Sequence, residues 1–334
     1  MSEAAAALGH DGSAAGPCFA SAELPAQLLE ACAAAAAVGE AIELGVLARV
    51  AEGAADPMTV AADCGLTQQG AAALLAALAG LDLLVLSDDG RFRPAFAGLA
   101  DFAELARPWA SLGLALRGER RPADASTIPG AEALYPGVVG QLASLFHESA
   151  EHAAGLLMQP GTRVLDVGAG AAPWSLALAA RDAGCRVTAV ELPGVIATTR
   201  RAVQRLGFEG RYQFVAGSAF HVDWGAPASF DLALVANLCH LFDPEANVHL
   251  LGRVAEALRP GGRVAIVDIL PNGRGDGPRS AVLYGLGLVL RTARGRIYPY
   301  STFRAWLDES GFGEVRRRAL AGPLPLTLIT ARRR

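Results

Sequence analysis

The sequence predicts an α/β protein in which an open, mostly parallel seven-stranded sheet follows a smaller helical domain. Two observations lead to this prediction. From Gly161 onward, short apolar runs with strand character alternate with helical patterns, which is typical of parallel strands joined by helices. The chain has 334 residues, of which 52% are hydrophobic and 19% are charged, so it can build more than one core and is not a disordered chain.

The sheet is expected to contain five parallel strands and a final antiparallel pair. Helices fill the gaps between the parallel strands, which gives a Rossmann-like arrangement with right-handed crossovers. The last two segments flank Gly322-Pro323 and predict a hairpin that finishes the sheet. The expected strands are 163–167, 186–190, 212–216, 232–236, 263–269, 314–319 and 324–330.

The N-terminal part is predicted to be helical after a mobile tail over residues 1–20. Residues 24–52 have a helical pattern that is apolar almost all round, so most sides of this helix must be buried. A domain of roughly 100 residues can hardly cover such a helix alone. We therefore expect a second subunit to cover it.

Residues 57–98 have the pattern of a small winged helix, with helices over 59–64 and 68–78 and a hairpin closed by an Asp-Gly turn. Modules of this shape often bind DNA. However, residues 50–90 contain six acidic residues and no basic residue. Because DNA affinity depends on neutralising phosphates, we assign the module to dimerisation.

The bridging region that follows contains helical stretches over 102–116 and 138–157, separated by a loop over 117–137, and is expected to roof the active site. These observations divide the chain into a disordered tail (1–20), a winged-helix-like dimerisation domain (21–105), bridging helices (106–158) and a ligand-binding domain (159–334).

Composition narrows the function classes. The formal net charge is −4, and all 29 basic residues are arginine, so nucleic acid is a poor default partner. No apolar run reaches about 18 residues, and no basic segment precedes the N-terminal alanines, so we expect a cytoplasmic protein without a membrane span. No His/Asp/Glu cluster has persuasive metal spacing, and we expect no metal. The odd set of cysteines without a C-x-x-C pair indicates a reduced compartment: Cys18, Cys32, Cys64, Cys185 and Cys239.

Residues 164–170, Val-Leu-Asp-Val-Gly-Ala-Gly, end the first predicted strand and lead into a helix near Pro173. Glycine-rich backbone at a helix N-terminus can bind an anion, but nucleotide dehydrogenases share this feature. Pro173 stands where a dinucleotide fold needs Gly or Ala. Asp166 can meet a cationic group, and Glu191, 21 residues after Gly170, can accept both hydroxyls of a ribose. S-adenosylmethionine combines these groups, and we predict it as the cofactor.

With these motifs the chain resembles the two-domain S-adenosylmethionine-dependent small-molecule O-methyltransferases of the caffeate and hydroxyindole type, which are common in bacterial secondary metabolism. The resemblance implies a class I methyltransferase domain and a homodimer formed through the winged-helix domain. It covers residues 24–334 and rests on segments 165–170, 191–195, 217–220, 237–245, 258–264, 267–271 and 306–312.

The resemblance also implies roles at the cofactor site. Asp166, Gly168 and Gly170 would line the methionine end, Glu191 would hold the ribose, and Leu192 would pack on the adenine. Ala172 replaces the third glycine of the loop, which costs little if its φ is negative.

One segment departs from the family pattern on the adenine side. Ser218 stands where the family usually has an aspartate that meets the adenine amine, so this contact is weaker or is supplied elsewhere. Ala219 and Phe220 complete the segment, and Phe220 keeps an aromatic contact.

His240 is the predicted general base. It follows the fourth parallel strand, at the edge where open α/β sheets bind ligands, and a neutral imidazole can take the proton of a phenol. Asp268 ends the neighbouring strand and matches the family acid that orients this base. A structural histidine and an ordinary strand-end acid are the alternatives. A second family acid is missing, and Arg296 and Tyr298 stand in that region.

The predicted product is a methylated small, aromatic or polyketide-like metabolite, with a hydroxyl oxygen as the favoured acceptor and carbon or nitrogen as options. A relative that binds the cofactor but performs hydroxylation, decarboxylation or a pericyclic step is the alternative. Candidate substrate contacts are Phe146, His147, Asn237, Tyr284 and Tyr298.

Overall fold

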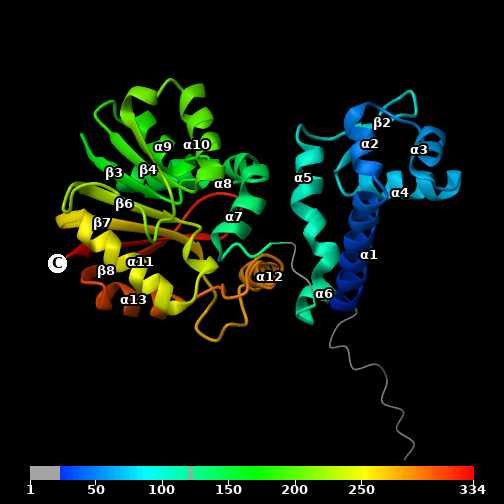
Figure 1. Cartoon of the computed structure of the whole chain (residues 1–334). Helices are drawn as coiled ribbons and strands as arrows, with labels where there is room; N and C mark the ends of the chain where they lie inside the picture. Colours follow the sequence, from blue (N-terminus) through cyan, green and yellow to red (C-terminus); the bar gives the residue numbers. More distant parts are fainter. Residues whose placement is uncertain (1–22, 120–122) are drawn as a thin grey trace, which may run out of the picture. The chain divides into compact units, whose positions relative to one another are not determined.

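The computed structural model describes residues 23–119 and 123–334, so the predicted tail and Cys18 lie outside the described residues (Figure 1). The chain divides into two compact units, which meet in the sequence between Arg107 and Pro108.

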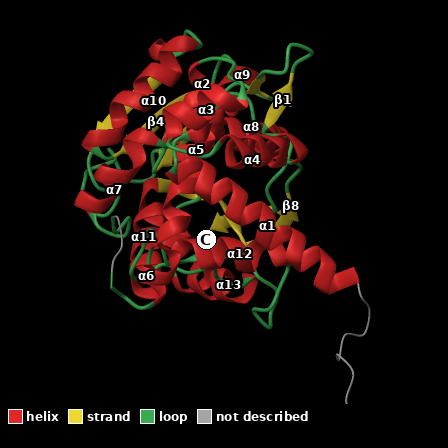
Figure 2. Cartoon of the chain, turned by 90° about the vertical axis from the view of Figure 1, so that its right-hand side faces the viewer, coloured by secondary structure: helices red, strands yellow, loops and turns green. Residues whose placement is uncertain are grey.

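The first unit has the predicted helix–turn–helix and hairpin (Figure 2). The Asp56 carboxylate accepts a hydrogen bond from the Thr59 backbone N–H and so begins the third helix, and Thr67 caps the fourth helix through the N–H of Gly70. The elements are α1 (Glu23–Glu43), α2 (Val46–Glu52), α3 (Pro57–Cys64), α4 (Gln68–Gly80), β1 (Leu84–Leu86), β2 (Phe92–Pro94) and α5 (Leu99–Ala106).

The N-terminal half of α1 leaves its apolar side chains in solvent. Leu24, Leu28 and Leu29 are 59%, 52% and 72% exposed, although the sequence predicted a helix buried on most sides. Within the described ranges no single helix has the length and hydropathy of a membrane span. The helices α1 and α2 meet these two criteria only when they are taken as one segment, which is bent by 66° between them.

The bridging region corrects one expectation. Residues 117–137 were expected to form a loop, but α7 (Ile128–Leu134) lies within them, followed by a 3₁₀ turn over Tyr135–Gly137. Thr127 caps α7 by accepting a hydrogen bond from Gly130 N, and Pro129 lies in its first turn. The other elements of this region are the 3₁₀ segment Arg107–Ser111, α6 (Leu112–Leu116) and α8 (Val139–Leu157).

The second unit contains the predicted seven-stranded sheet, with the order β5-β4-β3-β6-β7-β9-β8. β9 lies between β7 and β8 and runs antiparallel to both, whereas the strand pairs from β5 to β7 are parallel. The expected fold class is confirmed. The strands are β3 (Arg163–Val167), β4 (Arg186–Glu191), β5 (Tyr212–Ala216), β6 (Phe230–Ala236), β7 (Leu258–Ile269), β8 (Phe312–Ala319) and β9 (Leu326–Arg333).

Helices cover both faces of this sheet (Figure 1), as the nearly continuous apolar strands require. Alternate strand residues enter two separate cores: Val164 packs toward α8 and α9, and Leu165 packs toward α11 and α13. The chain order reverses between β3 and β6, which places a ligand crevice at the carboxyl ends of these strands. The helices are α9 (Pro173–Arg181), α10 (Pro193–Arg205), α11 (Pro244–Ala257), α12 (Arg279–Leu288) and α13 (Tyr300–Glu309).

Candidate active site

The glycine turn after β3 forms the floor of the crevice. Gly168 and Gly170 have φ values of +70° and +57°, which glycine adopts at little cost. A Cβ atom on Gly168 would lie 3.2 Å from both terminal methyl groups of Leu238. Ala172 also has a positive φ, +58°, so the condition under which this replacement would cost little is not met. The left-handed conformation costs an alanine roughly 1–2 kcal/mol.

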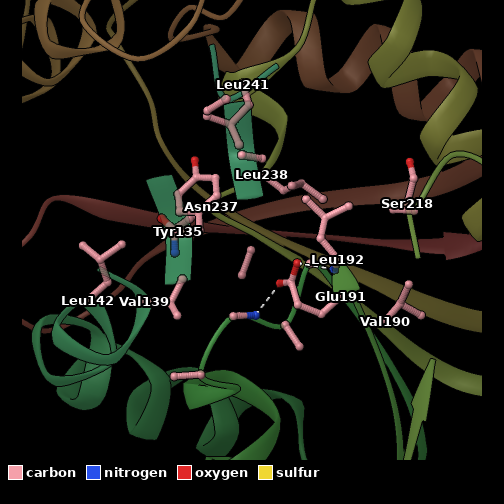
Figure 3. Close-up of a pocket in the computed structure, with 18 of the residues that line it drawn as sticks. Tyr135, Val139, Leu142, Val190, Glu191, Leu192, Ser218, Asn237, Leu238 and Leu241 are labelled. Carbon is pink, nitrogen blue, oxygen red and sulfur yellow. Dashed lines mark hydrogen bonds between the residues drawn. The ribbon is translucent and has the colours of Figure 1, made fainter. Parts of the chain in front are cut away.

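Glu191 at the end of β4 fastens this turn (Figure 3). Its Oε2 accepts a hydrogen bond of 2.7 Å from Gly170 N, and its Oε1 accepts one of 2.6 Å from Leu192 N. Burial raises the pKa of Glu191, and the two N–H donors oppose this effect. Because each carboxylate oxygen can accept two hydrogen bonds, each retains one lone pair for a ligand hydroxyl.

A cavity of about 270 Å³ lies over the turn. Val139 and Leu142 of α8 lie across it from Leu192 and Ser218 (Figure 3). Seven of the predicted cofactor residues line the cavity: Gly168, Gly170, Glu191, Leu192, Ser218, Ala219 and Phe220.

Asp166 does not belong to the cavity wall. Its side chain is buried under the turn, where Oδ2 accepts a hydrogen bond of 2.5 Å from Ser175 Oγ. Tyr212 donates in turn to the same Ser175 hydroxyl over 3.2 Å. Burial raises the pKa of Asp166 to about 7, against the lowering effect of the Ser175 hydrogen bond. Asp166 thus ties β3 to α9 and supports the turn from below.

His240 and Asp268 form a buried pair. His240 lies in the 3₁₀ turn Cys239–Leu241 after β6, and Asp268 lies at the end of β7. The distance between His240 Nδ1 and Asp268 Oδ1 is 2.7 Å, and Asp268 also accepts hydrogen bonds from the backbone N–H groups of His240 and Ile269. A carboxylate in this position keeps the proton on Nδ1, so Nε2 carries the basic lone pair.

The turn that carries His240 is held rigidly. The Asn247 side-chain amide donates to the carbonyl oxygens of Cys239, Phe242 and Asp243, and the Tyr298 hydroxyl donates to that of Phe242 over 2.7 Å. These bonds fix the backbone on both sides of the imidazole.

The predicted substrate contacts divide into two groups. Phe146 and Asn237 line the cavity. The Asn237 side-chain nitrogen is buried without a hydrogen-bond partner, so it is a donor available to a ligand. His147 is exposed on α8, and Tyr298 is buried with its ring 4.7 Å from that of Trp306; neither belongs to the cavity wall. Tyr284 reaches His240 instead, with its hydroxyl 3.0 Å from Nε2.

The bridging region was expected to roof the site, but the sequence analysis named no residue from α7 or the segments that flank it. Ala125, Ile128 and Tyr135 line the cavity there. The segment is held by a hydrogen bond of 2.7 Å from Ala125 N to Arg291 O and by one of 2.8 Å from Gly194 N to the Glu132 carboxylate. The pair Thr127 and Pro129, a helix cap and a first-turn proline, was the sequence signal that could have located it.

Comparison with known proteins assigns the family. Residues 132–313 match the O-methyltransferase domain, which is more than half of the chain. The chain therefore belongs to the O-methyltransferase domain family. The sequence-based identification of the O-methyltransferase family is confirmed.

Curated relatives include acetylserotonin O-methyltransferase of Mus musculus, which is 34% identical over 170 residues, or 50% of this chain and 43% of that protein. The chain thus matches less than half the length of this relative. 3-Hydroxy-5-methyl-1-naphthoate 3-O-methyltransferase of Streptomyces sahachiroi is 27% identical over 307 residues and is matched over 85% of this chain and 87% of its own.

Solved structures share the fold. Human N-acetylserotonin methyltransferase in complex with SAM has a TM-score of 0.71 at 21% identity, over 95% of this chain and 99% of that chain. The mitomycin 7-O-methyltransferase MmcR has a TM-score of 0.71 at 23% identity, over 93% of this chain and 97% of that chain. These likenesses in fold extend over both units of the chain.

Proposed function

We propose that this protein transfers a methyl group from S-adenosylmethionine to a hydroxyl oxygen of a small aromatic or polyketide-like metabolite. One observation carries the proposal: a glutamate-fastened glycine turn and a buried His–Asp pair lie at the carboxyl ends of neighbouring strands of one sheet. The names of two relatives, the naphthoate 3-O-methyltransferase and a mitomycin biosynthesis 6-O-methyltransferase, support a hydroxyl acceptor on a metabolite, which is aromatic in the first case.

The residues of the cavity fit this cofactor. Glu191 has one free lone pair on each oxygen for the two ribose hydroxyls, and Gly168 and Gly170 line the cavity with backbone atoms that a ligand can approach. The unpartnered amide of Asn237 offers a donor to a ligand carboxylate or acceptor group. When bound, S-adenosylmethionine supplies a methyl group already activated for displacement.

We assign the cofactor-binding roles accordingly. Gly168 and Gly170 form the methionine side, Glu191 holds the ribose, and the adenine side consists of Leu192, Ser218, Ala219 and Phe220. Asp166 acts beneath the turn rather than at the ligand, because its carboxylate is buried and bonded to Ser175.

His240 acts as the general base in this proposal. Asp268 holds the proton on Nδ1, so Nε2 is the nitrogen that takes up the proton released by the acceptor hydroxyl. The imidazolium that results lies 2.7 Å from a carboxylate, which stabilises its charge. A base positioned in this way contributes about 10²–10⁴-fold in rate.

We also propose that the protein is a homodimer and that α1 forms part of its interface. The support is the row of exposed Leu24, Leu28 and Leu29 on a helix that the sequence marks as apolar on nearly all sides. A second copy would bury this row.

To test this, the protein is incubated with S-adenosylmethionine and each member of a panel of hydroxylated naphthoates, indoles and quinones. The formation of S-adenosylhomocysteine is monitored by mass spectrometry. We expect product with at least one acceptor. His240→Ala should lower kcat by at least 100-fold with unchanged cofactor affinity, and His249→Ala, an exposed histidine on α11, should keep normal turnover. Consumption of an acceptor without S-adenosylhomocysteine would contradict methyl transfer, and normal turnover of His240→Ala would contradict the base assignment.

A further inference from the structure

The Tyr284 hydroxyl occupies Nε2, the basic nitrogen of His240. Asp268 is hydrogen-bonded to Nδ1 of His240, and the Tyr284 hydroxyl lies 3.0 Å from Nε2. The tyrosine and imidazole rings are T-shaped, with their centroids 5.3 Å apart. Since Nδ1 donates to the carboxylate, Tyr284 is the donor to Nε2. Both nitrogens of the imidazole are therefore occupied by the protein itself.

The imidazole has no direct access to the cavity. His240 is 3% exposed and Asp268 is 1% exposed, and neither lines the cavity described above. Tyr284 does not line the cavity itself, but it is associated with two residues that do: it packs against the same core cluster as Phe146, and Tyr135 contributes to raising its pKa. Because the Tyr284 hydroxyl already occupies Nε2, a proton can reach this nitrogen only through that hydroxyl, unless Tyr284 moves away.

We propose that Tyr284 is a catalytic proton relay between the acceptor hydroxyl and His240. This inference rests on the proposed function. As the acceptor oxygen forms its bond to the methyl carbon, its O–H bond breaks and the proton passes to the Tyr284 oxygen. The original Tyr284 proton passes at the same time to the Nε2 lone pair, while the electron pair of the methyl–sulfur bond goes to sulfur. Tyr284 ends as a neutral phenol, and the positive charge resides on His240 beside Asp268.

The surroundings of Tyr284 favour a relay over a separate phenolate. Burial raises the pKa of Tyr284, and Asp268 and Tyr135 add to this effect, so its ion is disfavoured and the two proton transfers must be concerted. The Arg291 guanidinium lies 4.8 Å from the ring centroid and lowers the same pKa, which eases transient charge on the oxygen. Arg291 has its Nε buried without a hydrogen-bond partner, and no ion pair is found for it within residues 23–119 and 123–334.

The test compares Tyr284→Phe with Tyr300→Phe under single-turnover conditions. Tyr300 is a matched control in the same unit. Its hydroxyl donates a hydrogen bond to the backbone carbonyl of Val315, and Tyr300 does not line the cavity. We expect Tyr284→Phe to lower the methyl-transfer rate at least tenfold, with unchanged affinity for S-adenosylhomocysteine, and Tyr300→Phe to leave the rate unchanged. Unchanged affinity also shows that the variant is folded.

A second measurement separates a relay from a structural contact. In mixtures of H₂O and D₂O the wild-type rate should depend on the deuterium fraction along a curve, because two protons move together, whereas a variant that retains a single transfer should give a straight line. An unchanged or raised rate for Tyr284→Phe would overturn the relay and mark Tyr284 as a cap that moves aside. If His240→Ala is inactive while Tyr284→Phe is fully active, only the relay fails; if His240→Ala is active, the base assignment fails as well.

Discussion

Replacing Asp166 by asparagine should make the second unit less sensitive to alkaline pH. Asp166 is 2% exposed, and burial raises its pKa to about 7 from an ordinary value of 3.8. A carboxyl whose pKa is higher in the folded than in the unfolded chain destabilises the fold once it ionises. This cost is absent below about pH 3.8, grows as the pH rises, and is complete above about pH 7.

The magnitude follows from the two pKa values. At 1.36 kcal/mol per unit, the cost is roughly 1.7 kcal/mol at pH 5 and roughly 4.3 kcal/mol at pH 8. Between these pH values the wild-type chain should therefore lose about 2–3 kcal/mol of unfolding free energy relative to Asp166→Asn. Asparagine keeps an oxygen that can accept the hydrogen bond from Ser175, so the change removes the charge and retains the contact.

Urea unfolding followed by tryptophan fluorescence can measure this difference at pH 5 and pH 8. All four tryptophans (Trp109, Trp174, Trp224 and Trp306) lie in the second unit, so the signal reports the unit that contains Asp166. The exposed carboxylate of Asp308, replaced by asparagine, is the control and should show the pH dependence of the wild type. An equal loss of stability in wild type and Asp166→Asn between the two pH values would refute the reasoning.

Two further predictions test the cofactor site and the dimer. Glu191→Ala removes an acceptor that binds Gly170 and Leu192 and faces the ligand, so the increase in melting temperature caused by S-adenosylhomocysteine should disappear; an unchanged increase would contradict the ribose assignment. Leu28→Glu places a charge in the exposed apolar row of α1 and should convert a dimer into a monomer in light scattering, whereas Glu30→Gln on the same helix should not; a dimer that persists in Leu28→Glu would remove α1 from the interface.

Much of the second unit could be predicted from the sequence, because its signals are local. Strand–helix alternation and buried runs such as Val164–Val167 predicted the sheet, and the spacing from Gly170 to Glu191 anticipated that both would line one cavity. This spacing is informative because β3 and β4 are parallel neighbours, so residues at their carboxyl ends must meet.

The remainder depends on tertiary contacts that leave little trace in local sequence. Asp166 and Glu191 are both carboxylates near the ends of parallel strands, yet of these two only Glu191 lines the cavity. Asp166 is instead hydrogen-bonded to Ser175 of α9. Tyr284 and His240 are 44 residues apart and come together through the packing of α12. The helix α7 was missed because its seven residues are too few for a clear periodic pattern.

The role of Ala172 shows how a general rule can fail at a particular residue. A non-glycine residue in the third position of the turn would cost little only with a negative φ, but the turn imposes +58° on Ala172. The strain persists because Ala172 is fully buried and its N–H is bonded to Ala169 O within the turn. Strained backbone of this kind is common where a turn approaches a ligand.

The central claim is that this cavity binds the methyl donor through Glu191 and the glycine turn. Isothermal titration calorimetry of the full chain with S-adenosylhomocysteine tests it directly, because the demethylated product contains the same ribose, adenine and amino acid groups. We expect saturable heat with one ligand bound per chain. A titration that shows only heat of dilution at millimolar ligand would contradict it.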